Sequence, residues 1–183
     1  MLIHQAFKDA NYEKLPMSTI WRRVLAEFIG TTLFVFIVSA SAVVPVAYLS
    51  SDPATADLIT AFIQGFGLAA IVSIFASISG GHYNPAISLT LTITRALAPL
   101  LCLYYVIAQL IGAILGAAIF RGSVGNYETL GATTLQAGIT PGQGFLLEFM
   151  ITTILLFVVV ETTADEDSAL FLAPIPIGIR LLM

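Results

Sequence analysis

Charged residues are scarce in this sequence, and so are the side chains that metal and disulfide chemistry need. Only 10% of its 183 residues are charged, against about a quarter in an ordinary soluble domain, and 58% are hydrophobic. A single cysteine, Cys102, excludes an intrachain disulfide and a thiol metal cluster. The net charge of −4 comes from few residues and points to no nucleic-acid partner. The composition is that of an integral membrane protein.

The sequence also lacks a recognisable catalytic or cofactor site. No nucleophile has a plausible base, and His82 has no second histidine, cysteine or acid clustered near it. The letters GFGLAA at 65–70 match a dinucleotide-binding fingerprint, but they lie within an apolar run that no strand precedes. We therefore expect no enzyme activity, no metal and no cofactor.

Long apolar runs are plentiful. A membrane-spanning helix needs about 20 mostly apolar residues. Four segments meet or approach that length: Val24–Leu49, Leu58–Ile78, Leu97–Phe120 and Phe145–Thr163. A fifth runs from Ala169 to Met183, about 22 Å of helix against a hydrocarbon core of about 30 Å. The sequence predicts an all-α membrane protein whose fifth helix is incomplete.

The positions of lysine and arginine predict the orientation. Residues 1–20 are mixed polar without the apolar core of a signal peptide, so we expect a cytosolic tail there and a membrane domain over 21–183. Four cations precede the first span: Lys8, Lys14, Arg22 and Arg23. The loop 50–57 has none, which predicts a cytosolic N-terminus, although Arg121 would then lie outside.

The first and fourth spans resemble each other at an offset of 148 − 27 = 121 residues. AEFIGTTLFVFIV (26–38) aligns with LEFMITTILLFVV (147–159), with identities that include Glu27 and Glu148. Because the chain crosses the membrane three times between the start of the first span and the start of the fourth, the second copy would enter the membrane from the opposite side. This predicts an inverted repeat, its halves at about 21–121 and 142–183, with a permeation site on discontinuous helices at the interface. Chance similarity between apolar helices is the alternative.

A polar break, SGGHYNPA, follows the second span and leads into a short apolar run, Asn84–Thr94. That run is about 16 Å long as a helix, half a bilayer, which favours a re-entrant segment. Asn84 is a good N-cap and Pro85 suits the first helical position. We expect the segment to descend from the cytosol, turn at Asn84 near the midplane and return to Arg95. An ordinary loop with an Asn-Pro turn is the alternative.

Such a half-helix would place the positive end of its dipole in the middle of a pore. Cations would be repelled there, and the Asn84 amide could donate to the oxygen of a neutral solute. The backbone carbonyls of Gly80, Gly81 and His82 would offer acceptors along the path.

These residues resemble the aquaporin (major intrinsic protein) family. SGGHYNPA is similar to its first Asn-Pro-Ala box, and AEFIGTTLFVF, AQLIGAILGA and GQGFLLEF to its first, third and fourth helices. The resemblance implies a right-handed bundle with two half-helices, a tetramer with one pore per subunit, and conduction of water or small neutral solutes. Asn84, Pro85 and Ala86 match the box, and Glu27 and Glu148 match buried acids that brace the re-entrant loops.

Two departures from the family pattern affect the expected function. One constriction residue is expected 20 residues before the box asparagine, and 84 − 20 gives Gln64, where water channels commonly carry an aromatic residue or histidine. A helix–helix hydrogen bond is the alternative role for Gln64. The second Asn-Pro-Ala box is missing, and Arg180 falls in the expected fifth helix, where a charged side chain is costly. We therefore expect a fragment or a truncated form that does not conduct by itself.

Three functions remain open at this point. The first is a channel subunit in a lipid bilayer, with the plasma membrane favoured. The second is a non-conducting truncated subunit that assembles with full-length family members. The third, a coupled transporter, has only Glu27 and Glu148 as candidate intramembrane ionisable groups.

A face of small residues on the third span, Ala108, Gly112 and Gly116, predicts helix packing rather than chemistry.

Overall fold

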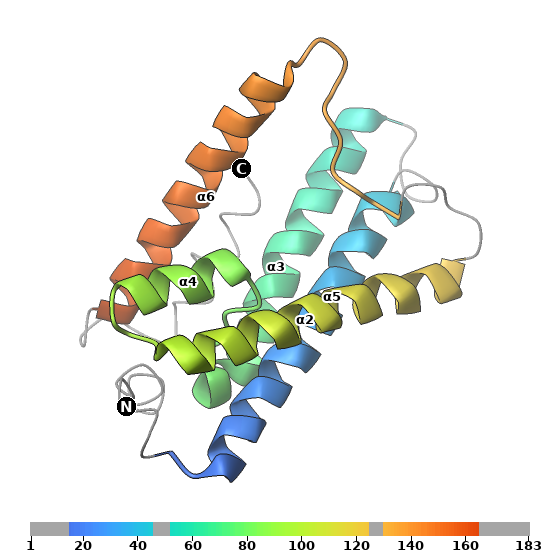
Figure 1. Ribbon diagram of the computed structural model, residues 1–183. Coiled ribbons are helices and arrows are strands. Elements are labelled where there is room, and N and C mark those ends of the chain that lie inside the picture. The colour runs from blue at the N-terminus through green and yellow to red at the C-terminus, as the bar shows by residue number, and fades with distance from the viewer. Residues whose placement is uncertain (1–14, 46–51, 125–129, 165–183) are drawn as a thin grey trace.

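The computed structural model describes residues 15–45, 52–124 and 130–164, and within these ranges all of its regular secondary structure is helical. Its helices are α2 (Met17–Val44), α3 (Pro53–Ser79), α4 (Pro85–Ile93), α5 (Pro99–Val124) and α6 (Pro141–Ala164) (Figure 1). Among the described helices, α2, α3, α5 and α6 are long and apolar enough to cross a membrane. The four predicted long spans and the predicted half-helix are therefore all present.

Prolines set several of the helix boundaries. Pro16 precedes α2, and Pro45 is its C-terminal cap. The observed start at Met17 lies seven residues before the predicted start at Val24, because the prediction counted only apolar residues while the helical hydrogen bonds continue into the polar flank. The last predicted residues of that span, 46–49, lie outside the described residues.

Helix α3 begins with a side-chain cap. Asp52 accepts a hydrogen bond from the backbone N–H of Thr55 at 3.0 Å and another from the Thr55 hydroxyl at 2.6 Å. These bonds, the hydroxyl bond foremost, lower the pKa of the Asp52 carboxyl from its usual range. The cap is therefore intact above the ordinary aspartate pKa and weakens as the pH falls through the lowered value.

Close packing of α2 against α5 forms the centre of the bundle. A Cβ added at Gly112 would lie 2.6 Å from the carbonyl oxygen of Phe28, and one at Gly116 would overlap the carbonyl oxygen of Thr32. Only glycine allows the two backbones to approach this closely. The contact advances in the same direction along both helices, so α2 and α5 run parallel. The predicted packing role of the two glycines is confirmed.

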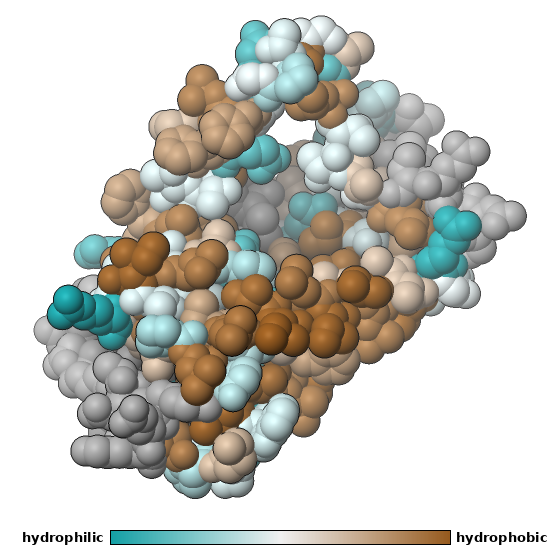
Figure 2. Space-filling view, viewed as in Figure 1, coloured by the Kyte–Doolittle hydropathy of each residue, from teal (hydrophilic) through white to brown (hydrophobic). Residues whose placement is uncertain are grey.

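Helix α6 packs more loosely than the other spans. Its C-terminal half contributes Leu155, Leu156 and Val159 to a cluster that includes Leu91 of α4 and Leu101 of α5. Figure 1 shows α6 running in the opposite sense to α2, the direction that the inverted-repeat hypothesis requires. Apolar side chains cover the surface along α5 in Figure 2, as expected for a helix that faces lipid.

Several sequence predictions fall on residues outside the described ranges. They are the cations Lys8 and Lys14 of the N-terminal tail, the incomplete fifth helix over 169–183, and Arg180 within it.

Candidate pore loop and its support

The carboxylate of Glu27 lies at the centre of the polar break. Its side chain is 0% exposed, and its Oε1 accepts from the Ser79 hydroxyl at 2.6 Å and from the backbone N–H of His82 at 3.0 Å. Its Oε2 accepts from the backbone N–H of Tyr83 at 2.8 Å and from the Gln109 amide at 2.8 Å. Four donors thus converge on one buried acid, which ties the loop after α3 to α2 and α5.

The backbone of the loop takes the special conformations that bring these N–H groups together. Gly80 and Gly81 have φ of 97° and 70°, and Tyr83 has φ of 48°. Positive φ costs glycine little and is uncommon for tyrosine. The Tyr83 ring lies where a side chain on Gly30 would sit, and its hydroxyl donates to the Ile71 carbonyl at 3.4 Å. Tertiary packing therefore holds the strained Tyr83 backbone in place.

The directions of the loop carbonyls follow from these bonds. The described peptides include no cis bond, so each carbonyl points opposite to the N–H of the next residue. Because the N–H groups of His82 and Tyr83 point at Glu27, the carbonyls of Gly81 and His82 point away from it. The N–H of Gly81 donates to the Ser79 hydroxyl at 3.2 Å, which turns the Gly80 carbonyl away from that hydroxyl. All three predicted acceptors are aimed away from the Glu27 cluster.

A second set of polar side chains joins the loop to α4 and α5. The Gln109 amide also donates to the Ser88 hydroxyl at 3.0 Å, and that hydroxyl is 3.0 Å from Nδ1 of His82. The Tyr105 hydroxyl donates to the Ser79 carbonyl at 2.9 Å, and its ring meets the His82 ring edge-on at 5.2 Å. This network fixes the half-helix relative to the loop that precedes it.

Asn84 caps the half-helix. Its Oδ1 accepts from the backbone N–H of Ala86 at 2.8 Å, and Pro85 occupies the first helical position. Because the cap uses the carbonyl oxygen, the amide nitrogen is the donor end of the side chain. Helix α4 has 9 residues, about 14 Å, and ends two residues before Arg95, so it is too short to cross a bilayer. The structure places Asn84 half-buried, at the positive end of this helix.

Gln64 is engaged with the neighbouring helix. Its Nε2 donates to the Ser41 hydroxyl of α2 at 3.0 Å, and the Thr60 hydroxyl donates to the Ser41 carbonyl at 2.7 Å. The alternative role considered for Gln64, a hydrogen bond between helices, is therefore present in the structure. Its side chain is half-buried, and a role at a constriction stays a prediction.

Glu148 does not lie in an environment like that of Glu27. Its side chain on α6 is exposed, so its predicted burial is not found in this structure. The physical reason is that α6 packs through its C-terminal half, and no described segment covers the turn that carries Glu148. The bracing role of Glu148 stays a prediction.

The described part of the chain contains no group of three His, Cys, Asp or Glu side chains placed to hold a metal ion. The groups around Asn84 are hydrogen-bond donors and acceptors, and the one carboxylate among them, Glu27, is fully engaged by four donors. Such an arrangement can orient a polar neutral molecule and offers no pair of residues for proton transfer or nucleophilic attack.

Comparison with known proteins identifies the fold and the family. Residues 14–183 match the family model described as Major intrinsic protein. The chain belongs to the major intrinsic protein family. Its structure is similar to the X-ray structure of the aquaglyceroporin from Plasmodium falciparum, with a TM-score of 0.74 at 24% identity, over 89% of this chain and 70% of that one. The aquaporin-like helical bundle expected from the sequence is confirmed.

Relatives within the major intrinsic protein family are longer than this chain. Aquaporin-8 of Botryotinia fuckeliana (strain B05.10) is 34% identical over 167 residues, which cover 87% of this chain and 51% of that protein. Aquaporin C of Dictyostelium discoideum is 33% identical over 177 residues, 94% of this chain and 64% of that protein. The chain thus spans less than two thirds of the length of these curated relatives.

Three residues of the site described above are not among those predicted from the sequence. Gln109, Ser88 and Tyr105 are each no more than 1% exposed, and each is hydrogen-bonded to the loop or to the groups that hold it. A signal for Gln109 was available, because a lone amide in an otherwise apolar span needs a partner inside the protein. Ser88 and Tyr105 give no such signal, since serine and tyrosine are common in membrane helices for other reasons.

Proposed function

We propose that this protein is a subunit of a passive membrane channel for water or small neutral solutes. The observation that carries the proposal is the half-helix α4, capped by Asn84 and preceded by a loop that Glu27 holds through four hydrogen bonds. Irregular backbone survives at membrane depth only against protein or a water-filled cavity. Membership of a family of channels supports the same conclusion and argues against an enzyme.

In this proposal the loop supplies hydrogen-bond acceptors to the solute, and the half-helix supplies a donor. The carbonyls of Gly80, Gly81 and His82, aimed away from Glu27, accept hydrogen bonds from the passing solute. The Asn84 amide donates to the solute oxygen at the positive end of α4. A cation loses its hydration at this point and meets a positive dipole, so it is excluded, whereas a neutral molecule exchanges its hydrogen bonds one for one.

Gln64 is proposed to influence which solute passes. Its hydrogen bond to Ser41 holds the amide nitrogen against α2, which leaves the amide oxygen as the group that could face a solute. A polar acceptor at this position would bind a solute with hydroxyl donors more favourably than an apolar side chain would.

The orientation and assembly are proposed from the resemblance and the charge pattern. The N-terminus is cytosolic, the membrane is the plasma membrane, and the complete channel is a tetramer with one pore per subunit. A non-conducting subunit that joins longer family members is the second candidate.

The test is reconstitution of the protein isolated from its native membranes, after its intact mass has been compared with 19.5 kDa. Stopped-flow light scattering would follow the shrinkage of proteoliposomes under an osmotic gradient of an impermeant solute, and swelling after entry of glycerol or urea. From a native protein heavier than 19.5 kDa we expect at least one of these fluxes to exceed that of protein-free vesicles, with no dissipation of a proton gradient. Absence of all three fluxes would overturn the channel proposal, and co-purification of a longer family member would then identify the second candidate.

A charge change at Asn84 tests the electrostatic part of the proposal. In the conducting form, Asn84→Asp would place a carboxylate at the positive end of α4, and we expect permeability to monovalent cations to rise by about tenfold. The matched control is Gln136→Glu, the same amide-to-carboxylate change at an exposed loop residue. Unchanged cation exclusion in an Asn84→Asp protein that still conducts water would contradict the dipole argument.

A further inference from the structure

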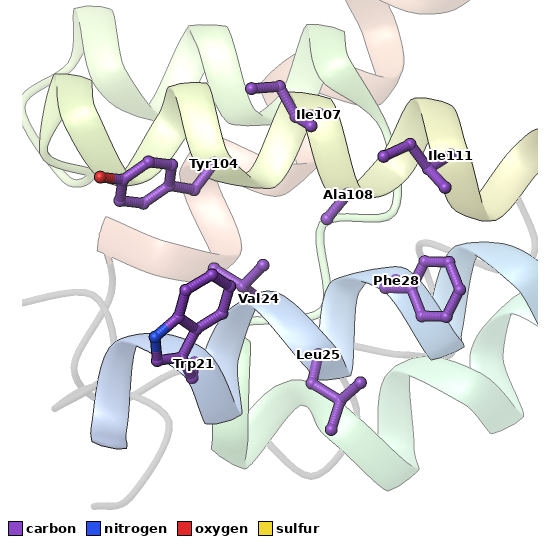
Figure 3. A pocket seen from close by; sticks show the side chains of 8 residues that line it. All are labelled: Trp21, Val24, Leu25, Phe28, Tyr104, Ile107, Ala108 and Ile111. Atoms are coloured by element: carbon purple, nitrogen blue, oxygen red, sulfur yellow. The ribbon is translucent and has the colours of Figure 1, made fainter. Parts of the chain in front are cut away.

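An apolar groove runs along the outside of the bundle between α2 and α5 (Figure 3). Its volume is about 350 Å³, and only apolar atoms line it. The groove is distinct from the pore loop, since it lies on the outer faces of two spanning helices. The side chains that define it include Trp21, Leu25 and Phe28 from α2, and Tyr104, Ala108 and Ile111 from α5.

The groove exists because small and large side chains alternate along the contact between these helices. Gly112 and Gly116 bring α5 against the backbone of α2 further along the helices. One turn before Gly112, Ala108 is 6% exposed and too small to fill the space between the helices. Leu25 and Ile111, 55% and 54% exposed, form the raised edges. The result is a groove between the two helices, in place of the nearly flat surface that a single helix would present.

The surroundings of the groove identify its occupant as a lipid chain. Both walls belong to helices that are long and apolar enough to span the membrane, so the groove opens to hydrocarbon. Trp21 on α2 and Tyr104 on α5 both lie at the end of the groove nearest the helix N-termini (Figure 3). Amphipathic aromatic rings of this kind lie at the level of lipid headgroups. From Trp21 to Phe28 the groove extends about 10 Å toward the membrane interior.

The charge at that end selects the headgroup. Arg22 is exposed and follows Trp21 directly, and Arg95 is exposed just before α5 begins. Arg22 is therefore within one turn of the aromatic residue that marks the membrane interface on α2, whereas Arg95 lies in the turn before α5 and is not among the residues that line the groove. A cation near the surface attracts anionic lipid over zwitterionic lipid.

We propose that the groove binds one acyl chain of an anionic glycerophospholipid, with the headgroup phosphate beside Arg22. The aromatic pair contacts the glycerol region, and Ala108 leaves room for the chain. The site does not depend on whether the protein conducts. A helix of a neighbouring subunit is the competing occupant, and it predicts a different experimental result.

Trp21 provides a direct probe, because it is the single tryptophan of the chain. Bromine atoms on an acyl chain quench indole fluorescence on contact. The protein would be reconstituted in bilayers that contain phosphatidylglycerol or phosphatidylcholine with a dibrominated chain, at equal mole fractions. We expect brominated phosphatidylglycerol to associate with Trp21 about fivefold more strongly, the preference that one arginine near an anionic lipid provides.

Two variants separate the groove from the general membrane surface. Arg22→Gln changes an exposed residue, so the fold should persist, and the preference should fall to about one while both lipids still quench. In Trp21→Phe/Leu103→Trp the indole moves to an exposed position on α5, one residue before Tyr104 and outside the groove. That indole should show no preference between the two lipids.

Three results would overturn the proposal. Equal quenching of Trp21 by the two lipids would remove the headgroup selectivity. An equal preference at the control indole would assign the effect to the surface potential of the membrane. Protection of Trp21 from both brominated lipids would mean that another polypeptide covers the groove. Ala108→Leu adds a test of the chain site: it should reduce quenching of Trp21 in a protein whose circular dichroism shows unchanged helix content.

Discussion

At the scale of single residues, Glu27 determines how the polar break is held. A carboxylate is the one side chain that can accept from four donors without offering a proton of its own. Ser79, His82, Tyr83 and Gln109 supply those four donors. The loop conformation thus depends on the chemistry of one buried group.

We expect Glu27→Gln to destabilise the protein by about 3 kcal/mol, because the new amide hydrogens face backbone N–H groups and leave buried donors unpaired. The thermal midpoint in detergent, followed by circular dichroism, should fall by roughly 10 °C. Glu148→Gln is the matched control, since it makes the same change at the equivalent repeat position, where the side chain is exposed. Equal losses of thermal stability in the two variants would contradict the conclusion that Glu27 holds the loop.

At the scale of elements, the parallel pair of α2 and α5 organises the bundle. The glycines of α5 bring the helices close enough for Gln109 to reach Glu27 across the interface, and the same closeness leaves the groove beside Ala108. The half-helix α4 then packs against α5 through Leu91 and Leu101. The close packing of small residues thus determines both the support of the pore loop and the shape of the lipid-facing surface.

Gly112→Ala should destabilise this pair by about 1–3 kcal/mol, because the added methyl group would lie 2.6 Å from the Phe28 carbonyl oxygen and the backbones would have to separate. Gly122→Ala on the same helix has nothing within 4 Å of the added carbon, and we expect it to be neutral or to stabilise the helix by up to about 1 kcal/mol. Thermal unfolding of both variants in the same detergent would measure the difference. A Gly112→Ala protein as stable as the Gly122→Ala protein would refute the close-packing argument.

At the scale of the whole molecule, the described chain supplies one wall of the proposed pore. Helices α2, α3 and α5 surround the loop, whereas α6 touches them mainly at its C-terminal half and leaves Glu148 exposed. The chain also covers only 51% of one curated relative in the family. The described helices therefore enclose the loop only on the side of α2, α3 and α5.

We therefore expect the 183-residue chain, reconstituted alone, to give no water flux above that of empty vesicles. The measurement is stopped-flow osmotic shrinkage, with a full-length aquaporin at equal protein density as the positive control. Rapid shrinkage with this chain alone would show that its helices complete a pore by self-association, and the single-wall description would be wrong.

Local sequence features were sufficient to predict most of the fold. Apolar runs gave the four long spans, and the Asn-Pro step at 84–85 predicted the start of the half-helix, because N-capping and the fixed φ of proline act on neighbouring residues. Helix ends were less well predicted. Helix α2 begins seven residues before the expected start, since hydrophobicity marks the membrane core and not the limits of the backbone hydrogen bonds.

The sequence by itself determined the class of the protein, the half-helix and the acid at 27, because each depends on composition, on local backbone chemistry or on a motif. Only the tertiary structure decided which groups meet that acid, since Ser79, Tyr83 and Gln109 come from three different segments. It likewise decided that Gln64 bonds to Ser41 and that Glu148 is exposed. Contacts between segments follow from how helices cross, and helix crossing is set by side-chain packing over the whole bundle rather than by any one stretch of the chain.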